Sequence, residues 1–122
     1  MSESLTVEVV NIEGRCPVYQ VGDRFEIVAG YRLRCEREVC LHALMALAPY
    51  YVALSRGVEP ADLGLAGPDG AAYVQCLDPQ AITGGGTVTF RIRVSSGGLS
   101  AADDADLPQR DHRPQGLMTT LL

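Results

Sequence analysis

The chain has 122 residues, of which 47% are hydrophobic and 20% charged, and its net charge at neutral pH is −5. This length predicts one hydrophobic core and argues against a two-domain enzyme with an interdomain cleft. The negative charge argues against a nucleic-acid partner, which needs many basic contacts to phosphates. All ten basic residues are arginines, which excludes Schiff-base chemistry and a P-loop phosphate site.

Two segments near the N-terminus predict β-strands. Residues 5–12 alternate apolar and polar side chains, which is typical of a half-buried strand. Residues 24–28 follow a Val-Gly-Asp turn, and Phe25 and Ile27 share one face of that segment. We expect the two strands to pair in antiparallel fashion.

Residues 38–56 predict the one long helix of the chain. Apolar side chains cover most of its circumference, so it should be largely buried, and Gly57 provides a C-terminal stop. Pro49 lacks a backbone donor and clashes with the preceding turn. The sequence therefore predicts a kink, or two abutting helices, near Ala48.

Two more strands are expected towards the end of the domain, at residues 72–77 and 87–94, and the second shows the clearest alternation in the chain. The prediction is an α+β domain with the order ββαββ, in which antiparallel hairpins pack on the kinked helix. The domain should span residues 1–95. Residues 96–122 lack a sustained period and predict a flexible C-terminal tail.

The N-terminal residues show no signal-peptide pattern, and no apolar run reaches the roughly 18 residues that a membrane span needs. We therefore expect a cytoplasmic protein without membrane association. Cysteines are kept reduced in that compartment, so the four cysteines indicate a metal or redox role before a disulfide scaffold. The alternative is that each one is a small buried hydrophobic residue.

Three cysteines occur where loops meet regular structure. Cys16 follows the first strand, Cys40 lies in the first helical turn, and Cys76 ends the third strand. Such junctions can converge, and three thiolates would suit zinc or an iron–sulfur cluster. Cys35 could join the group or point elsewhere. The spacing lacks the paired C-x-x-C of structural zinc sites, which weakens the hypothesis.

Four short motifs occur in a fixed order: G-x-C-P at 14–17, V-C-x-x-A at 39–43, P-Y-x-x-A-L-x-R-G at 49–57 and C-x-D-P at 76–79. In this respect the chain resembles an uncharacterised family of short prokaryotic proteins. The resemblance implies a compact domain whose recurring cysteines are Cys16, Cys40 and Cys76. It supplies no established activity.

Two main classes of function follow. In the first, Cys16, Cys40 and Cys76 form a metal or iron–sulfur site. In the second, the protein is a non-catalytic accessory or regulatory module that binds a partner protein through an exposed strand edge, the face of Arg91 and Arg93, or the tail. A thiol-redox enzyme is a third alternative, weakened by the missing C-x-x-C. The sequence does not decide whether the protein is an enzyme, nor its oligomeric state.

Overall fold

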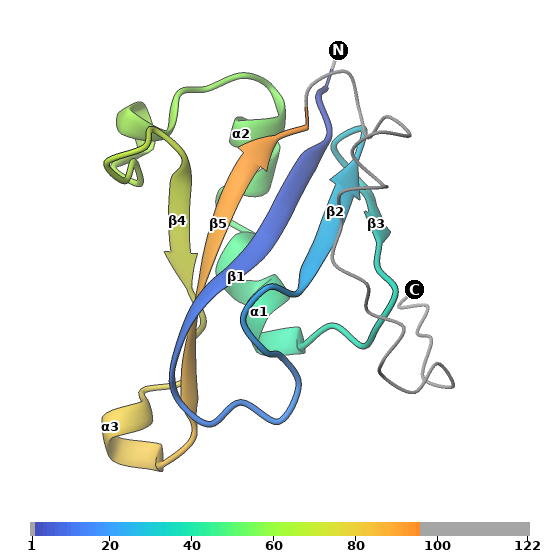
Figure 1. Ribbon diagram of the computed structural model, residues 1–122. Helices are drawn as coiled ribbons and strands as arrows, with labels where there is room; N and C mark the ends of the chain where they lie inside the picture. Colours follow the sequence, from blue (N-terminus) through green and yellow to red (C-terminus); the bar gives the residue numbers. More distant parts are fainter. Residues whose placement is uncertain (1, 96–122) are drawn as a thin grey trace.

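The computed structural model describes residues 2–95 and shows a small mixed α/β domain built on one antiparallel five-stranded sheet. The strand order across the sheet is β3-β2-β1-β5-β4 (Figure 1). The predicted tail at 96–122 lies outside the described residues. The strands are β1 (Leu5–Gly14), β2 (Arg24–Val28), β3 (Arg32–Arg34), β4 (Ala72–Gln75) and β5 (Gly86–Val94).

The first and last strands form the centre of the sheet. β1 pairs with β5 along nearly its whole length, from Leu5 opposite Val94 to Gly14 opposite Gly86. The register shifts between Val9 and Asn11, where β1 holds one extra residue, as in a β-bulge. The other side of β1 pairs with β2 in antiparallel fashion, as the sequence predicted.

The structure contains a strand that the sequence analysis missed. β3 follows β2 through a tight turn in which the Tyr31 N–H donates to the Val28 carbonyl at 3.2 Å. Both central residues of this turn, Ala29 and Gly30, have positive φ angles of 57° and 89°, as a type I′ hairpin turn requires. β3 itself has only three residues, too few for a periodic signal.

The single kinked helix is replaced by two short helices, α1 (Leu41–Leu47) and α2 (Tyr51–Ser55). Pro49 lies between them and has no N–H to continue the hydrogen-bond ladder. Each helix is buried on one side only, so the expectation of one largely buried helix is wrong. Short helical turns also precede and follow β4: η1 (Pro60–Leu63) and α3 (Gln80–Thr83). The order ββαββ is therefore too simple.

The core lies between one face of the sheet and the two helices α1 and α2, which Figure 1 shows behind the strands. Alternate residues of the strands supply most of it, and Ala43, Leu47 and Leu54 supply the helical side. Phe90 is fully buried at the centre. No helix in the described part of the chain is long and apolar enough to cross a membrane.

Candidate functional site

The cysteines predicted as metal ligands have separate structural roles. Cys16 follows β1, and its Sγ accepts a hydrogen bond from the Tyr19 N–H at 3.3 Å. Cys40 is the N-cap residue of α1, and its backbone N–H donates to Tyr19 Oη at 3.0 Å. Cys76 is buried against β5, where its Sγ accepts from the Val88 N–H at 3.3 Å. These contacts join loop, helix and strand to the core.

The predicted metal or iron–sulfur centre at Cys16, Cys40 and Cys76 is wrong. Among residues 2–95, no group of three or more His, Cys, Asp or Glu side chains is placed to hold a metal ion. The prediction assumed that the junctions would turn their sulfurs towards one point. Instead the Cys76 sulfur contacts the backbone of β5 and the Cys16 sulfur closes a turn within its own loop. Burial raises the pKa of the Cys35 thiol, which disfavours the thiolate that binds metals.

Tyr19 organises this corner of the core. Its ring stacks on Phe25 with centroids 6.5 Å apart and meets Phe90 edge-on at 5.6 Å. Burial raises the pKa of the Tyr19 hydroxyl well above its usual value, although the hydrogen bond from the Cys40 N–H opposes that rise. The phenol therefore stays neutral and holds the start of α1 against the sheet.

The other side of the sheet, which faces away from α1 and α2, is polar. Side chains alternate along a strand, so every second residue projects to this side. We call the part of this side around Glu8 and Glu26 the open face and define it by five arginines, three carboxylates, a threonine and a tyrosine: Arg24, Arg32, Arg34, Arg91, Arg93, Glu8, Glu26, Asp69, Thr6 and Tyr73. Glu13, opposite Thr87, lies on the same side of the sheet but beyond this part. The open face spans all five strands and the loop before β4.

Glu8 occupies the centre of the open face, opposite Arg24 of β2 and Arg91 of β5. Its Oε1 accepts a hydrogen bond from Arg91 Nη2 at 2.6 Å, and its Oε2 lies 4.0 Å from Arg24 Nη2. The hydrogen bond to Glu8 raises the pKa of Arg91, and partial burial acts in the opposite direction. One carboxylate thus holds two guanidinium groups in register across three strands.

A second pair lies towards the β3 edge. Glu26 is buried on β2, and its Oε1 lies 3.0 Å from Nε of Arg34, the residue opposite it on β3. The side chain of Arg34 is 60% exposed, whereas that of Glu26 is only 7% exposed. The negative charge of this pair is therefore covered and the positive charge faces solvent.

Asp69 anchors the β5 end of the open face. Its Oδ2 accepts from the Tyr73 hydroxyl at 2.8 Å and lies 3.5 Å from both Arg91 Nη1 and Arg93 Nη2. The hydrogen bond from Tyr73 is the largest cause that lowers the pKa of Asp69, followed by the Ala71 N–H. The carboxylate therefore stays ionised and positions two arginines, of which Arg93 is the more exposed.

The five arginines and three carboxylates give the open face a formal charge of +2, whereas the whole chain carries −5. Arg32, Arg34 and Arg93 are exposed. Arginine stays protonated and has no acceptor, so it cannot act as a general base. The arrangement is suited to binding anionic groups rather than to proton transfer.

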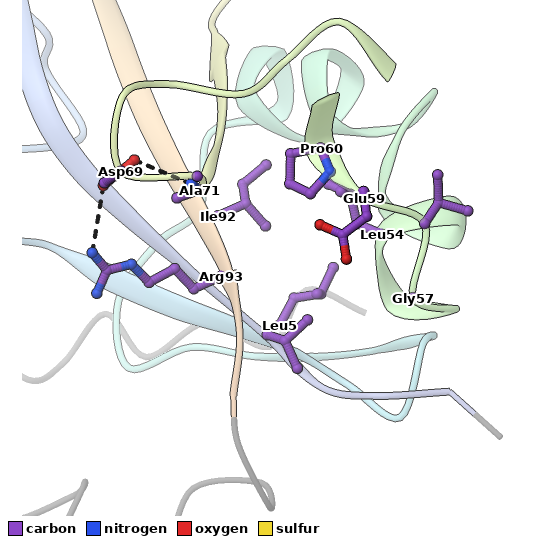
Figure 2. A pocket seen from close by; sticks show the side chains of 12 residues that line it. Leu5, Leu54, Gly57, Glu59, Pro60, Asp69, Ala71, Ile92 and Arg93 are labelled. Carbon is purple, nitrogen blue, oxygen red and sulfur yellow. Dashed lines mark hydrogen bonds and ion pairs between the residues drawn. The ribbon is translucent and has the colours of Figure 1, made fainter. Parts of the chain in front are cut away.

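A shallow pocket of about 370 Å³ adjoins the open face at Arg93. Figure 2 shows Leu5, Leu54, Pro60 and Ile92 around it, with the ion pair of Asp69 and Arg93 on one side and Glu59 on the other. The pocket combines an apolar lining with one arginine and two carboxylates, those of Asp69 and Glu59, so it could receive an apolar side chain.

Comparison with known proteins gives no match to a family model, to a curated protein or to a solved structure.

Sequence reasoning found part of the open face. The alternation in residues 87–94 had indicated Arg91 and Arg93 as a possible contact surface. The contribution of Arg32 and Arg34 was missed because β3 was not predicted. Asp69 lies in a loop, and only the pairing of β4 with β5 brings it to the arginines.

Proposed function

We propose that the chain is a non-catalytic protein-interaction module whose open face binds an acidic segment of a partner protein. The observation that carries this proposal is the local charge of +2 on a chain of charge −5. Charge complementarity steers association and fixes orientation, even where each exposed ion pair contributes little affinity.

The partner segment would be short and would combine acidic residues with one apolar residue. Arg34 and Arg93 lie towards opposite sides of the face, and both are more than half exposed. An extended peptide that crosses the strands would reach both guanidinium groups. The pocket beside Arg93 would then receive the apolar side chain.

A protein partner fits better than nucleic acid. Nucleic-acid binding sites neutralise many phosphates, and their affinity rises with the number of basic contacts. Here four of the five arginines of the open face already pair with a carboxylate: Arg24, Arg34 and Arg91 with Glu8 or Glu26, and Arg93 with Asp69. The remaining positive charge suits a segment with two or three carboxylates.

Fluorescence anisotropy tests the proposal with a labelled peptide of about ten residues, rich in glutamate and containing one leucine. Arg34→Glu and Arg93→Glu should each weaken binding by about three- to tenfold, because each reversal replaces attraction by repulsion. Arg15→Glu is the matched control, since Arg15 is exposed outside the open face and the charge change is identical.

Three outcomes would contradict the proposal. The first is no binding of the acidic peptide, and the second is an equal loss in all three variants. The third is tighter binding of a single-stranded oligonucleotide of the same length, which would assign the open face to nucleic acid instead.

A further inference from the structure

The described part of the chain ends beside the open face. Ser95 follows β5, and its Oγ forms a hydrogen bond of 2.5 Å with Oγ1 of Thr6, which belongs to the open face. The Ser95 N–H also donates to the Ser4 carbonyl at 2.7 Å. Ser95 is only 7% exposed, so its backbone and its side chain are both held. Residues 96–122 therefore continue the chain from a fixed point next to Thr6 and Arg93, which stand opposite each other on β1 and β5.

The continuing sequence contains the kind of segment that the open face is suited to bind. Residues 102–107 have the sequence Ala-Asp-Asp-Ala-Asp-Leu, and we call them the aspartate segment. They combine one leucine with three carboxylates, those of Asp103, Asp104 and Asp106. No basic residue occurs in the sequence between Arg93 and Arg110, so the charge of this stretch is purely negative. Its composition matches the partner segment that the proposed function requires.

The exposed arginines of the open face lie within reach of the aspartate segment. Four residues stand in one row across β3, β2, β1 and β5: Arg34, Glu26, Thr6 and Arg93. Neighbouring strands are about 4.8 Å apart, so about 14 Å separates the backbones of Arg34 and Arg93. Asp103 lies eight residues after Ser95, and eight fully extended residues span at most about 29 Å. Asp103 can therefore reach either guanidinium group, and so can the aspartates that follow it.

The positive groups of this row are more accessible than the negative ones. The side chains of Arg34 and Arg93 are 60% and 55% exposed. Those of their partners, Glu26 and Asp69, are 7% and 34% exposed. An incoming carboxylate therefore has easier access to the guanidinium groups than to the carboxylates that repel it. Each guanidinium has five N–H donors, so it can keep its own partner and still bind an aspartate.

We propose that the aspartate segment docks on the open face of its own chain, along the row from Arg93 to Arg34, and competes there with the acidic segment of the partner. This inference rests on the proposed function, because it assigns a competitor to the same face. A tether of this length gives an effective concentration on the order of 1 mM. A segment with a dissociation constant of about 1 mM then covers the face about half of the time, and the partner must displace it.

Amide chemical shifts of the isotope-labelled full chain test the docking without any partner. The neutralised chain carries three substitutions: Asp103→Asn, Asp104→Asn and Asp106→Asn. Its amide signals at Thr6, Arg34 and Arg93 should differ from those of the unaltered chain, because the docked carboxylates are lost. The matched control makes the same change of charge at three carboxylates outside both the segment and the open face: Glu13→Gln, Asp62→Asn and Asp111→Asn. It should leave the three signals where they are in the unaltered chain.

The same variants are compared in binding the glutamate-rich peptide. The neutralised chain should bind it about two- to fourfold more tightly than the unaltered chain, because the competitor is removed. The control should change the affinity by less than about 1.5-fold, since exposed charges far from the site are largely screened. A substitution on the open face acts on the peptide and on the aspartate segment alike. Its full effect on peptide affinity is therefore measured in the neutralised chain.

Two results would overturn the docking: unchanged amide signals at Thr6, Arg34 and Arg93 in the neutralised chain, or equally tighter peptide binding by the control. A signal difference present at about 500 μM protein and absent at about 50 μM would overturn the assignment to the same chain, since contact within one chain does not depend on concentration.

Failure of the proposed function gives a different pattern. Neither the unaltered nor the neutralised chain would then bind the peptide, while a change in the amide signals would still support docking of the aspartate segment. Conversely, peptide binding of equal strength by both chains, with unchanged amide signals, would overturn the docking and leave the proposed function standing.

Discussion

Glu8→Gln tests two properties of the open face: its contribution to stability and its binding of an acidic peptide. The substitution keeps the size of the side chain but removes the negative charge between Arg24 and Arg91. A hydrogen bond to a charged group contributes about 1.5–3 kcal/mol to stability. The side chains of Glu8 and Arg91 are 22% and 24% exposed, so solvent weakens the pair. We therefore expect the free energy of unfolding to fall by about 1–2 kcal/mol, and Tm by about 5–10 °C.

The same substitution should improve binding of the acidic peptide. It raises the formal charge of the open face from +2 to +3, and we expect about two- to fivefold tighter binding. Thermal unfolding and anisotropy on the same preparation measure both effects. Glu13→Gln is the stability control, because Glu13 is exposed near the end of β1 and its substitution should change stability by less than about 0.5 kcal/mol. An unchanged Tm would refute the role of Glu8, and weaker peptide binding would refute the attraction by positive charge.

Three further outcomes are expected. Tyr19→Phe leaves the Cys40 N–H at the start of α1 without its partner, so urea unfolding should show a loss of about 1–2 kcal/mol; a loss below about 0.3 kcal/mol would contradict this role. Ala29→Gly replaces an alanine that has a positive φ of 57°. It should raise the free energy of unfolding by about 0.5–1 kcal/mol in the same assay, because relief of the left-handed strain exceeds the added entropy of glycine in the unfolded chain. A less stable variant would argue against strain in this turn. The pKa of Asp69 is lowered in the folded state, so its contribution to stability is complete at neutral pH and is lost as the pH falls through the folded pKa, below about 3.9. The difference in stability between the unaltered chain and Asp69→Asn should therefore disappear only in that acidic range. A difference that disappeared nearer neutral pH would be inconsistent with the lowered pKa.

The sequence predicted the strands in which the alternation of apolar and polar side chains is long enough to be recognised. Residues 24–28 match β2, and residues 87–94 fall within β5. β3 could not be predicted in this way, because it exists through pairing with β2, which places Leu33 opposite Ile27. Pro49 predicted either a kink or two helices near Ala48, and the structure has two separate helices there.

The candidate site was less accessible to sequence reasoning. The cysteines were grouped because of their positions at junctions, and position along the chain does not fix the direction of a side chain. Cys76 follows the inward side of β4 and contacts β5, which only the strand order reveals. The open face depends on the same strand order, since Glu8 meets Arg24 and Arg91 only because β1 lies between β2 and β5.

The pairing of β1 with β5 means that the centre of the sheet is completed last during synthesis. β1 and β2 are made early and can pair at once, but the second edge of β1 has no partner until residue 94 has left the ribosome. Contacts between such distant segments form slowly, and an unpaired strand edge is a template for pairing with other chains. A nascent or truncated chain that ends before β5 is thus at risk of aggregation, and the arrival of β5 closes that edge.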